Sequence, residues 1–421
     1  MCAFLTTRSH GIKVPWLYCL SWALLAFMLA IAPAQAQQPL NRGEAVALLR
    51  TEFARAQALL EARRPDEARA ILERLVIAAP ETPAFRLLLA EVLLRQGVAD
   101  RARFHYHALR GAQLSPADRA HVEARLAALA GGKRWAGHLS FGLVPQSNVG
   151  KRTADDTITI GGIDFQLDEA SKARSGTGLS FSAGLTRRVV LSHDTLLRFG
   201  AQGSGFVYAD RRFNDMRLNA LVALERQAGQ NLTVEMGLNH TLRLLADRPY
   251  ARGPGLWLAA RTRLGRATVL TTRAQVDWLT HPDAPGLDGA RQGLSLGLHH
   301  QASPTLALTA QLSFDRTDAR QPAQAGDGAL VALGLRQAFA GGVTVGLDAS
   351  LRRDARDAPD GLFGLRREDH TTSVALKLMR RDLRIFNHAP MIEIRHEQRR
   401  STLPLAAFRN TSLGLYLSRE F

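Results

Sequence analysis

The sequence predicts a protein with two folded domains, of the fold class α+β. Three observations predict it: an apolar leader, a 34-residue repeat of helical period, and apolar residues on every second position from Trp135 onward. We therefore expect a signal peptide at residues 1–36 and a small all-α domain at residues 37–132. A 14-stranded antiparallel transmembrane β-barrel is expected at residues 133–421.

The leader has the pattern of an exported protein. Arg8 and Lys13 give it a basic start, and residues 16–31 are mostly apolar. Ala34 and Ala36 are the small residues that a signal peptidase requires, so we expect a cleaved signal peptide. The alternative is an uncleaved anchor helix, for which the apolar run is short and lacks a basic stop.

Cysteine content and charge narrow the possible chemistry. Both cysteines, Cys2 and Cys19, lie in the leader, so the mature chain has neither disulfides nor thiol chemistry. The formal net charge is +16, and loss of the leader's two basic residues lowers it to +14. After an export signal, this charge favours a lipid bilayer with anionic headgroups as a partner over nucleic acid. Arginines that simply solvate the surface are the alternative explanation.

A repeat of 34 residues follows the leader. Placing residues 59–75 over residues 93–109 aligns Leu59 with Leu93, Leu60 with Leu94, Ala68 with Ala102, Arg69 with Arg103, Leu72 with Tyr106 and Leu75 with Leu109. Each copy has the pattern of a helix, a polar turn and a second helix, with an alanine where the helices approach closely. This pattern resembles the tetratricopeptide repeat, whose unit has 34 residues. Residues 115–118 then predict the capped start of one further helix.

Tetratricopeptide-like repeats present a concave face that binds a peptide or a protein. The candidate residues for binding such a partner, or client, on that face are Arg86 and Glu91, on the first helix of the second pair, and Arg119, in the third segment. The alternative is that all three are ordinary solvated charges.

From Trp135 the chain alternates between apolar and polar or small residues. In residues 306–314, for example, most positions of one parity are leucine and those of the other are mostly threonine, glutamine or serine. Exported strands of about ten residues with an apolar outer face and a polar inner face are typical of outer-membrane barrels. We predict fourteen strands, near residues 134–144, 175–187, 195–209, 213–226, 231–244, 254–265, 267–281, 289–302, 304–316, 327–338, 341–354, 369–382, 389–400 and 409–421.

The connections broadly alternate between short and long. Residues 227–230 and 341–342 are short, as periplasmic turns are, whereas residues 145–174, 281–290, 316–328 and 353–370 are long. The first of these long connections contains an alternating stretch of its own, so we expect a small extra hairpin there.

The last strand has the pattern of an assembly signal. Leu413, Leu415 and Leu417 share their parity with the final Phe421. A terminal strand that ends in phenylalanine resembles the signal read by the outer-membrane insertion machinery. Arg419 departs from this pattern, because an apolar or aromatic residue is more common at that position.

The stretch RWAGHLSFGLVPQSNVGKRT, residues 134–153, resembles the first barrel strand and following turn of the surface lipoprotein assembly modulator (Slam) family. The matching residues are Trp135, Pro145, Ser147, Asn148 and Val149, whereas Gly150 stands where the family has asparagine. The order of leader, tetratricopeptide-like repeats and fourteen-stranded barrel is also similar to that family, and it covers nearly the whole mature chain.

The resemblance implies an outer-membrane protein that exports or displays client proteins, either surface lipoproteins or soluble secreted binding proteins. The repeats, in the periplasm, would engage the client, and a monomeric barrel would provide the passage. The candidate lumen residues are His138, Arg198, Gln202, Glu235, Arg243, Arg261, Arg263, Arg273 and Asp277. Any barrel of this width needs polar residues inside, so a passive porin and a structural tether remain the alternatives.

Motifs of catalysis are absent from the sequence. It has no phosphate-binding glycine loop, nucleophile elbow or zinc helix motif, so we expect neither an enzyme nor a cofactor or metal site. His299 and His300 are adjacent, and on a strand they face opposite sides. The arginines are scattered without an aromatic platform, which disfavours nucleic-acid binding.

Overall fold

The computed structural model describes residues 42–132, 134–380, 383 and 390–420. The predicted signal peptide lies outside these residues. Among them, no helix is both long and apolar enough to cross a membrane.

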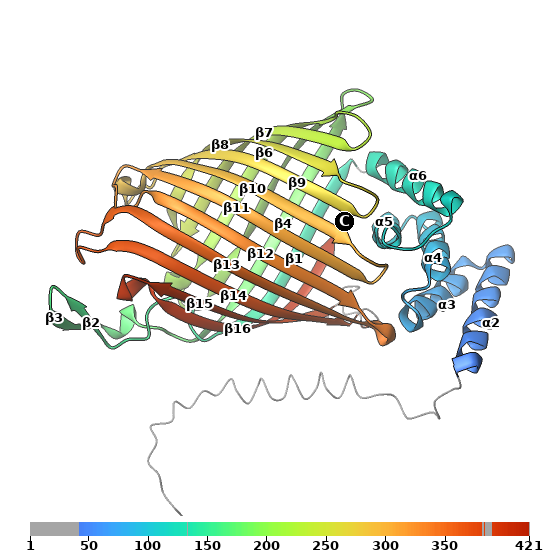
Figure 1. Ribbon diagram of the computed structural model, residues 1–421, viewed down its shortest axis with the longest axis horizontal. Coiled ribbons are helices and arrows are strands. Elements are labelled where there is room, and N and C mark those ends of the chain that lie inside the picture. Colours follow the sequence, from blue (N-terminus) through green and yellow to red (C-terminus); the bar gives the residue numbers. More distant parts are fainter. Residues whose placement is uncertain (1–41, 133, 381–382, 384–389, 421) are drawn as a thin grey trace, which may run out of the picture. The chain divides into compact units, whose positions relative to one another are not determined.

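The helices of the N-terminal part follow one another as the repeat predicts (Figure 1). Within the described residues they are α2 (Arg42–Glu61), α3 (Pro65–Ala78), α4 (Pro83–Arg95), α5 (Ala99–Leu109) and α6 (Pro116–Gly132). The helices α3, α4 and α6 begin at proline, whose fixed φ and missing N–H suit the first helical position. The hydroxyl of Ser115 accepts a hydrogen bond from the backbone N–H of Asp118 at 3.1 Å, which caps α6.

The 34-residue spacing is visible in the packing of these helices. Ala68 and Ala102 are both fully buried, and so are Leu72 and its equivalent Tyr106. The turns inside the two helix pairs also correspond, because Arg63 has a φ of 58° and Gly97, 34 positions later, has a φ of 75°. A left-handed residue after a helix ends it in the same way in both copies. The tetratricopeptide-like fold predicted from the sequence is therefore confirmed.

Fourteen described strands form one closed antiparallel barrel, as predicted (Figure 1). Each strand pairs with its neighbours along the chain, and β1 closes the barrel by pairing with both β4 and β16. The strands are β1 (Trp135–Gln146), β4 (Gly176–Val190), β5 (Thr195–Tyr208), β6 (Asp215–Gln227), β7 (Leu232–Leu245), β8 (Arg248–Arg263), β9 (Thr268–Leu279), β10 (Gly289–Gln301), β11 (Leu306–Ala319), β12 (Gly326–Ala338), β13 (Val343–Pro359), β14 (Arg366–Arg380), β15 (Pro390–Ser401) and β16 (Phe408–Glu420).

The extra hairpin expected between the first two barrel strands is present. The strands β2 (Thr157–Ile160) and β3 (Ile163–Gln166) pair with each other and belong to a separate two-stranded sheet. Gly161 and Gly162 form the turn with φ values of 58° and 83°, a conformation that favours glycine.

The two ends of the barrel differ in the length of their connections. At the end where β1 begins and β16 finishes, the described connections are short: residues 191–194, 228–231, 264–267, 302–305 and 339–342. Among the fully described connections, the longest are residues 147–175 and 280–288, at the opposite end. Because short turns are typical of the periplasmic side, the repeats join the barrel at its periplasmic end.

Five strand boundaries differ from the predicted ones by three residues or more: the ends of β4, β11 and β13 and the starts of β8 and β14. The strand β8 begins at Arg248 rather than near residue 254, because Ala246 and Asp247 form a two-residue turn with φ values of 50° and 63°. The sequence did not predict the start of this strand because it contains Pro249 and Pro254, and proline is unusual inside a sheet. The strands β13 and β14 extend to Pro359 and from Arg366, into a predicted loop whose many charged residues concealed the alternation.

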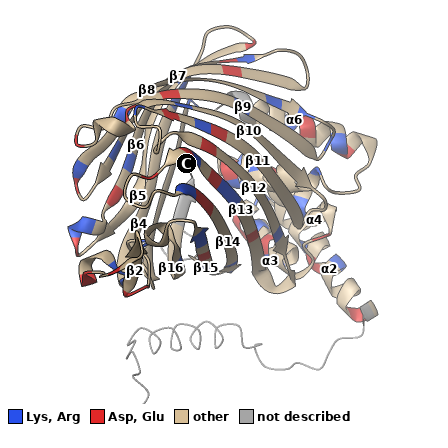
Figure 2. Ribbon diagram, turned by 60° about the vertical axis from the view of Figure 1, so that its left-hand side comes forward, with Lys and Arg blue, Asp and Glu red and all other residues tan. Residues whose placement is uncertain are grey.

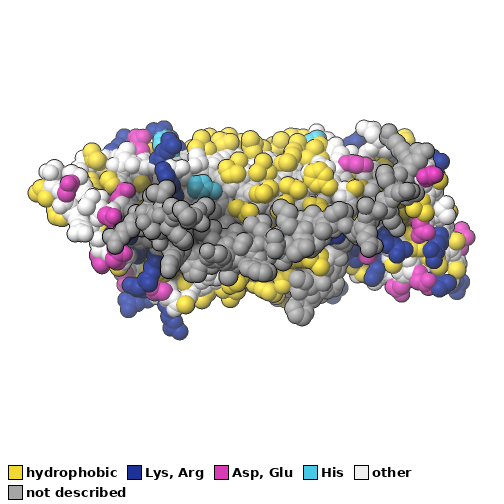
Figure 3. Space-filling model, turned by 90° about the horizontal axis from the view of Figure 1, so that it is seen from below, with side chains coloured by type: hydrophobic (Ala, Val, Ile, Leu, Met, Phe, Trp, Pro, Cys, Tyr) yellow, Lys and Arg dark blue, Asp and Glu magenta, His cyan; other side chains and the backbone are white. Residues whose placement is uncertain are grey.

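The alternation along the strands separates two faces. Leucine and phenylalanine of one parity, such as Leu139, Phe141 and Leu143, are about half exposed and point away from the lumen. Residues of the other parity point inward, and Figure 2 shows basic and acidic positions spread along the strands. On the face seen in Figure 3, hydrophobic side chains gather over the middle of the barrel. An apolar outer band of this kind is what a bilayer requires.

Candidate functional site

The strand register places all the residues named for the lumen on inward positions. They are His138 on β1, Arg198 and Gln202 on β5, Glu235 and Arg243 on β7, Arg261 and Arg263 on β8, and Arg273 and Asp277 on β9. The pairing of Gly184 with both His138 and Gln202, for example, puts these two side chains on one face. Their part in the passage of a client stays a prediction.

Opposite charges alternate on the inner wall formed by β11 to β16, which we call the paired wall. Arg352 donates to Asp315 at 2.9 Å and contacts Asp354 at 2.6 Å. Further pairs join Arg367 to Asp369 at 2.7 Å, Lys377 to Asp348 at 2.7 Å and Arg395 to Glu393 at 3.0 Å. These basic groups are therefore neutralised by carboxylates of the wall itself.

The inner wall formed by β4 to β9, which we call the arginine wall, has an indole at its centre. Trp257 is only 1% exposed, and its ring lies below the guanidiniums of Arg273 and Arg198 at 4.2 and 5.9 Å. A Cβ on Gly237 would lie 2.6 Å from the indole, so the ring needs glycine at that position. Arg198 also donates to Glu235. Cation–π contact and small neighbours thus fix the guanidiniums on this wall.

Glu91 is a structural centre of the repeat domain. Its carboxylate accepts hydrogen bonds from Tyr106 at 2.5 Å, His121 at 2.6 Å and Arg125 at 2.9 Å, which ties α4 to α5 and α6. Burial acts to raise the pKa of Glu91, but the three hydrogen bonds outweigh it and hold that pKa below its ordinary value. Burial and the bond to Glu91 raise the pKa of Tyr106.

The other two residues named for the client-binding face differ in exposure. Arg86 is 1% exposed and donates to the carbonyl of Pro80 at 2.8 Å, so its guanidinium packs inside the helices instead of facing a client. Arg119 is partly exposed and donates to the carbonyl of Leu114 at 2.9 Å. The structure does not bring the three named residues together around one exposed site. A client-binding role for Glu91 and Arg119 stays a prediction.

Ser147 and Asn148 close the barrel at its extracellular end. The side chain of Asn148, 1% exposed, donates to the carbonyls of Arg152 at 2.7 Å and Arg409 at 3.1 Å. The backbone N–H of Asn148 donates to the side chain of Asn410 at 3.0 Å, and the hydroxyl of Ser147 accepts from the N–H of Thr411 at 2.8 Å. Ser147, Asn148, Asn410 and Thr411 therefore join the turn after β1 to β16. We call these four residues the seam latch.

The remaining family-motif residues lie along the same strand. Trp135 is half exposed at the periplasmic end, where the guanidinium of Arg187 lies 5.0 Å from its ring. An indole is favoured at the membrane interface. Pro145 has no N–H to donate, and it lies in the gap between two paired stretches of β1 and β16. The backbone of Val149 donates to the carbonyl of Arg174 at 2.9 Å.

The leucines of the predicted assembly signal lie on the outward face of β16. Leu415 is 41% exposed and pairs with Leu143, and Leu417 pairs with Phe141. Leu413, at 8% exposure, lies nearer the seam latch. Phe421 lies outside the described residues. Recognition of this strand by the insertion machinery stays a prediction.

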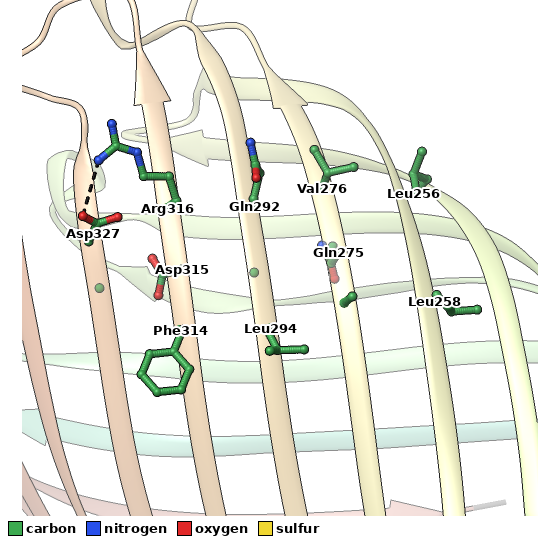
Figure 4. A pocket seen from close by; sticks show the side chains of 13 residues that line it. Leu256, Leu258, Gln275, Val276, Gln292, Leu294, Phe314, Asp315, Arg316 and Asp327 are labelled. Carbon is green, nitrogen blue, oxygen red and sulfur yellow. Dashed lines mark hydrogen bonds and ion pairs between the residues drawn. The ribbon is translucent and has the colours of Figure 1, made fainter.

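One concavity of the described barrel lies in its outer wall (Figure 4). It has a volume of about 740 Å³, and its apolar side chains include Leu258, Leu294 and Phe314. An ion pair between Arg316 and Asp327, at 3.4 Å, marks its polar edge. The concavity is therefore a hollow in the apolar band on the outer surface of the barrel.

Comparison with known families decides the identity of the chain. The profile described as surface lipoprotein assembly modifier matches residues 135–421, which is the whole barrel. This protein belongs to the surface lipoprotein assembly modifier family. A tetratricopeptide repeat profile matches residues 59–126 of this family member. No curated protein matched the chain.

Several solved outer-membrane proteins are distantly similar to this assembly modifier. The outer membrane channel DcaP of Acinetobacter baumannii is 9% identical, with a TM-score of 0.42, over 68% of this chain and 96% of that one. A FadL homologue of Pseudomonas aeruginosa is 10% identical, with a TM-score of 0.39, over 68% and 90%. The toluene transporter TodX of P. putida is 13% identical, with a TM-score of 0.38, over 68% and 90%. Similarity this low supports no conclusion about this chain, and the assignment rests on the family match.

Family and architecture together place this assembly modifier in the outer membrane, with its repeats in the periplasm. The function that the family indicates for this protein is surface lipoprotein assembly. Sequence reasoning missed Arg188, Trp257 and Asn410, all of which line the lumen or the seam. Their parity along the strands was available, but which neighbours they contact depends on the register between strands.

Proposed function

We propose that this protein carries client proteins across the outer membrane or displays them at the cell surface. The repeats engage the client in the periplasm and the barrel provides the passage, without catalysis. One observation carries the proposal: a tetratricopeptide repeat domain directly precedes a barrel that the surface lipoprotein assembly modifier profile matches over its whole length. The clients are surface lipoproteins or soluble secreted binding proteins.

The chemistry of the lumen supports this proposal. The paired wall holds its basic side chains in ion pairs, which leaves a polar surface without exposed single charges along most of that wall. The polar groups of a polypeptide need such hydrogen-bonding surroundings, because an apolar passage would leave them unsatisfied.

Removal of the repeats tests the proposal. A strain producing the chain without residues 37–132, but with its signal peptide, is compared with a strain producing the full chain. Surface exposure of lipoproteins is measured on intact cells by protease shaving and mass spectrometry. We expect at least one lipoprotein to lose its surface exposure about tenfold while the barrel still reaches the outer membrane.

A passive channel gives the opposite result. Its solute flux would be unchanged by the loss of the repeats, and no protein would change its exposure at the cell surface. That outcome, with equal amounts of folded barrel in both strains, would overturn the export proposal.

A further inference from the structure

Two pairs of arginines face each other directly across neighbouring strands of the arginine wall. Arg188 on β4 is the register partner of Arg198 on β5, and Arg217 on β6 is the partner of Arg243 on β7. Side chains in such positions have Cβ atoms about 4.5–5.5 Å apart, and like charges there destabilise the sheet. The wall therefore holds repulsive pairs that an added anion would relieve.

Each pair contains one arginine that lacks a carboxylate. Arg198 is bound by Glu235, and Arg243 contacts Asp215 at 2.8 Å. Within the part of the chain that the structure describes, Arg188 and Arg217 form no ion pair. The paired wall differs in this respect, because most of its basic groups contact carboxylates.

Hydrogen bonding points to the same place. The Nε atoms of Arg188 and Arg198 are both buried and have no hydrogen-bond acceptor among the described residues. A buried donor without an acceptor costs free energy, so two such donors side by side favour the binding of a ligand with oxygen acceptors. Glu225 pairs in register with Glu235 and forms no ion pair in the described chain.

The spacing of the two pairs suits an extended ligand. Ser204 on β5 is the register partner of Arg217. It lies six positions from Arg198 on the same strand, which corresponds to about 20 Å along the strand. Between them, Gln202 and Asn219 face the lumen as register partners, and Asn219 donates to Thr241 at 2.9 Å. Uncharged amides between two cationic pairs can hydrogen-bond to the backbone of a chain whose carboxylates reach both pairs.

We propose that the arginine wall binds an acidic, extended polypeptide segment of the client, with its carboxylates at Arg188/Arg198 and at Arg217/Arg243. The proposal rests on the proposed function for the source of that segment. Its geometry favours a polypeptide over a small anion, because a small anion occupies one pair only.

A peptide-binding experiment with the purified full chain in detergent tests this proposal. The probe is a fluorescein-labelled peptide of twelve glutamates, and its anisotropy is measured at low salt, where charge interactions are screened least. We expect the double variant Arg188→Gln with Arg217→Gln to bind about tenfold more weakly. Arg188→Lys with Arg217→Lys retains the charge and should bind within about threefold of the wild type.

The matched control removes two charges from the paired wall, those of Arg336 on β12 and Arg399 on β15, by Arg336→Gln with Arg399→Gln. We expect it to weaken binding less than twofold, and equal losses in both double variants would overturn the proposal. No binding of the glutamate peptide by the wild type would also overturn it. Displacement of the peptide by millimolar inorganic phosphate, at one phosphate per chain, would show a small-anion site instead.

The proposed function fails separately from this inference. The peptide measurement uses no client and no cells, whereas the repeat deletion is assessed by surface exposure. A protein that binds the glutamate peptide but exports nothing would refute the proposed function alone.

Discussion

Glu91 is the residue on which the packing of three helices depends. Its carboxylate accepts hydrogen bonds from α5 and α6, and its side chain is 14% exposed. Hydrogen bonds to a charged group contribute more to stability than hydrogen bonds between neutral groups, about 1.5–3 kcal/mol each. Most of that contribution disappears when the charge is removed.

We therefore expect Glu91→Gln to destabilise the helical domain by about 2 kcal/mol at neutral pH. The measurement is thermal unfolding of the full chain in detergent, followed by the helical signal at 222 nm. Because the pKa of Glu91 is lowered in the folded state, its contribution is complete above the ordinary value of 4.5 and is lost as the pH falls through the lowered pKa. The two proteins should thus converge in strongly acidic solution.

Glu67→Gln is the control for this prediction. Among the residues that the structure describes, Glu67 forms an ion pair with Arg64 alone, at 2.6 Å, and its side chain is 53% exposed. An exposed pair contributes less than about 1 kcal/mol. A difference between wild type and Glu91→Gln that stayed constant from pH 7 to pH 3 would contradict the role assigned to the charge.

The seam between β1 and β16 is the element whose closure depends most on side chains. Its ladder is interrupted between Leu143 and Gln146, where Pro145 cannot donate a hydrogen bond. The seam latch continues the connection beyond this gap. Asn410 is 5% exposed and donates to Gln146 at 2.8 Å while it accepts from the backbone of Asn148.

We expect Asn410→Ala to loosen the extracellular end of this seam. It leaves the N–H of Asn148 without its acceptor, at a cost of about 1–3 kcal/mol. Hydrogen exchange measured by mass spectrometry should rise in residues 146–149 and 408–412 and stay unchanged in β9 to β12. Asn219→Ala is the control, since Asn219 bonds Thr241 within the lumen. Equal exchange in Asn410→Ala and the wild type would refute the latch.

At the scale of the whole molecule, the helical repeats have a core of their own. Leu72, Leu89, Leu93, Tyr106 and Leu109 are all at most 1% exposed. Burial of a leucine or aromatic side chain contributes roughly 1.5–3 kcal/mol. The domain boundary at residue 132 is a proposal that follows from this core.

We expect residues 37–132, produced alone, to fold. Circular dichroism should show a helical spectrum and a cooperative thermal transition, and Leu72→Asp should abolish that transition because it buries an unpaired charge. A fragment that shows no cooperative transition under any condition in which the full chain is folded would contradict the boundary.

Much of the architecture could be predicted because it depends on local patterns. The period of 34 predicted the helix pairs, and the period of 2 predicted all fourteen strands, with the largest boundary errors at the start of β8 and the end of β13. Parity also placed the residues named for the lumen on inward positions. The site could be predicted less well, because Arg86 has the spacing of an exposed residue and is in fact buried by neighbouring helices.

The sequence by itself determined the two-domain order, the number of strands and the inward direction of the residues named for the lumen, because each follows from a periodicity along the chain. Only the tertiary structure decided which of those side chains meet. The opposition of Arg188 to Arg198, the contact of Trp257 with two guanidiniums and the bond from Asn148 to Asn410 depend on the register of different strands. Register is a property of pairs of strands, and no single strand contains it.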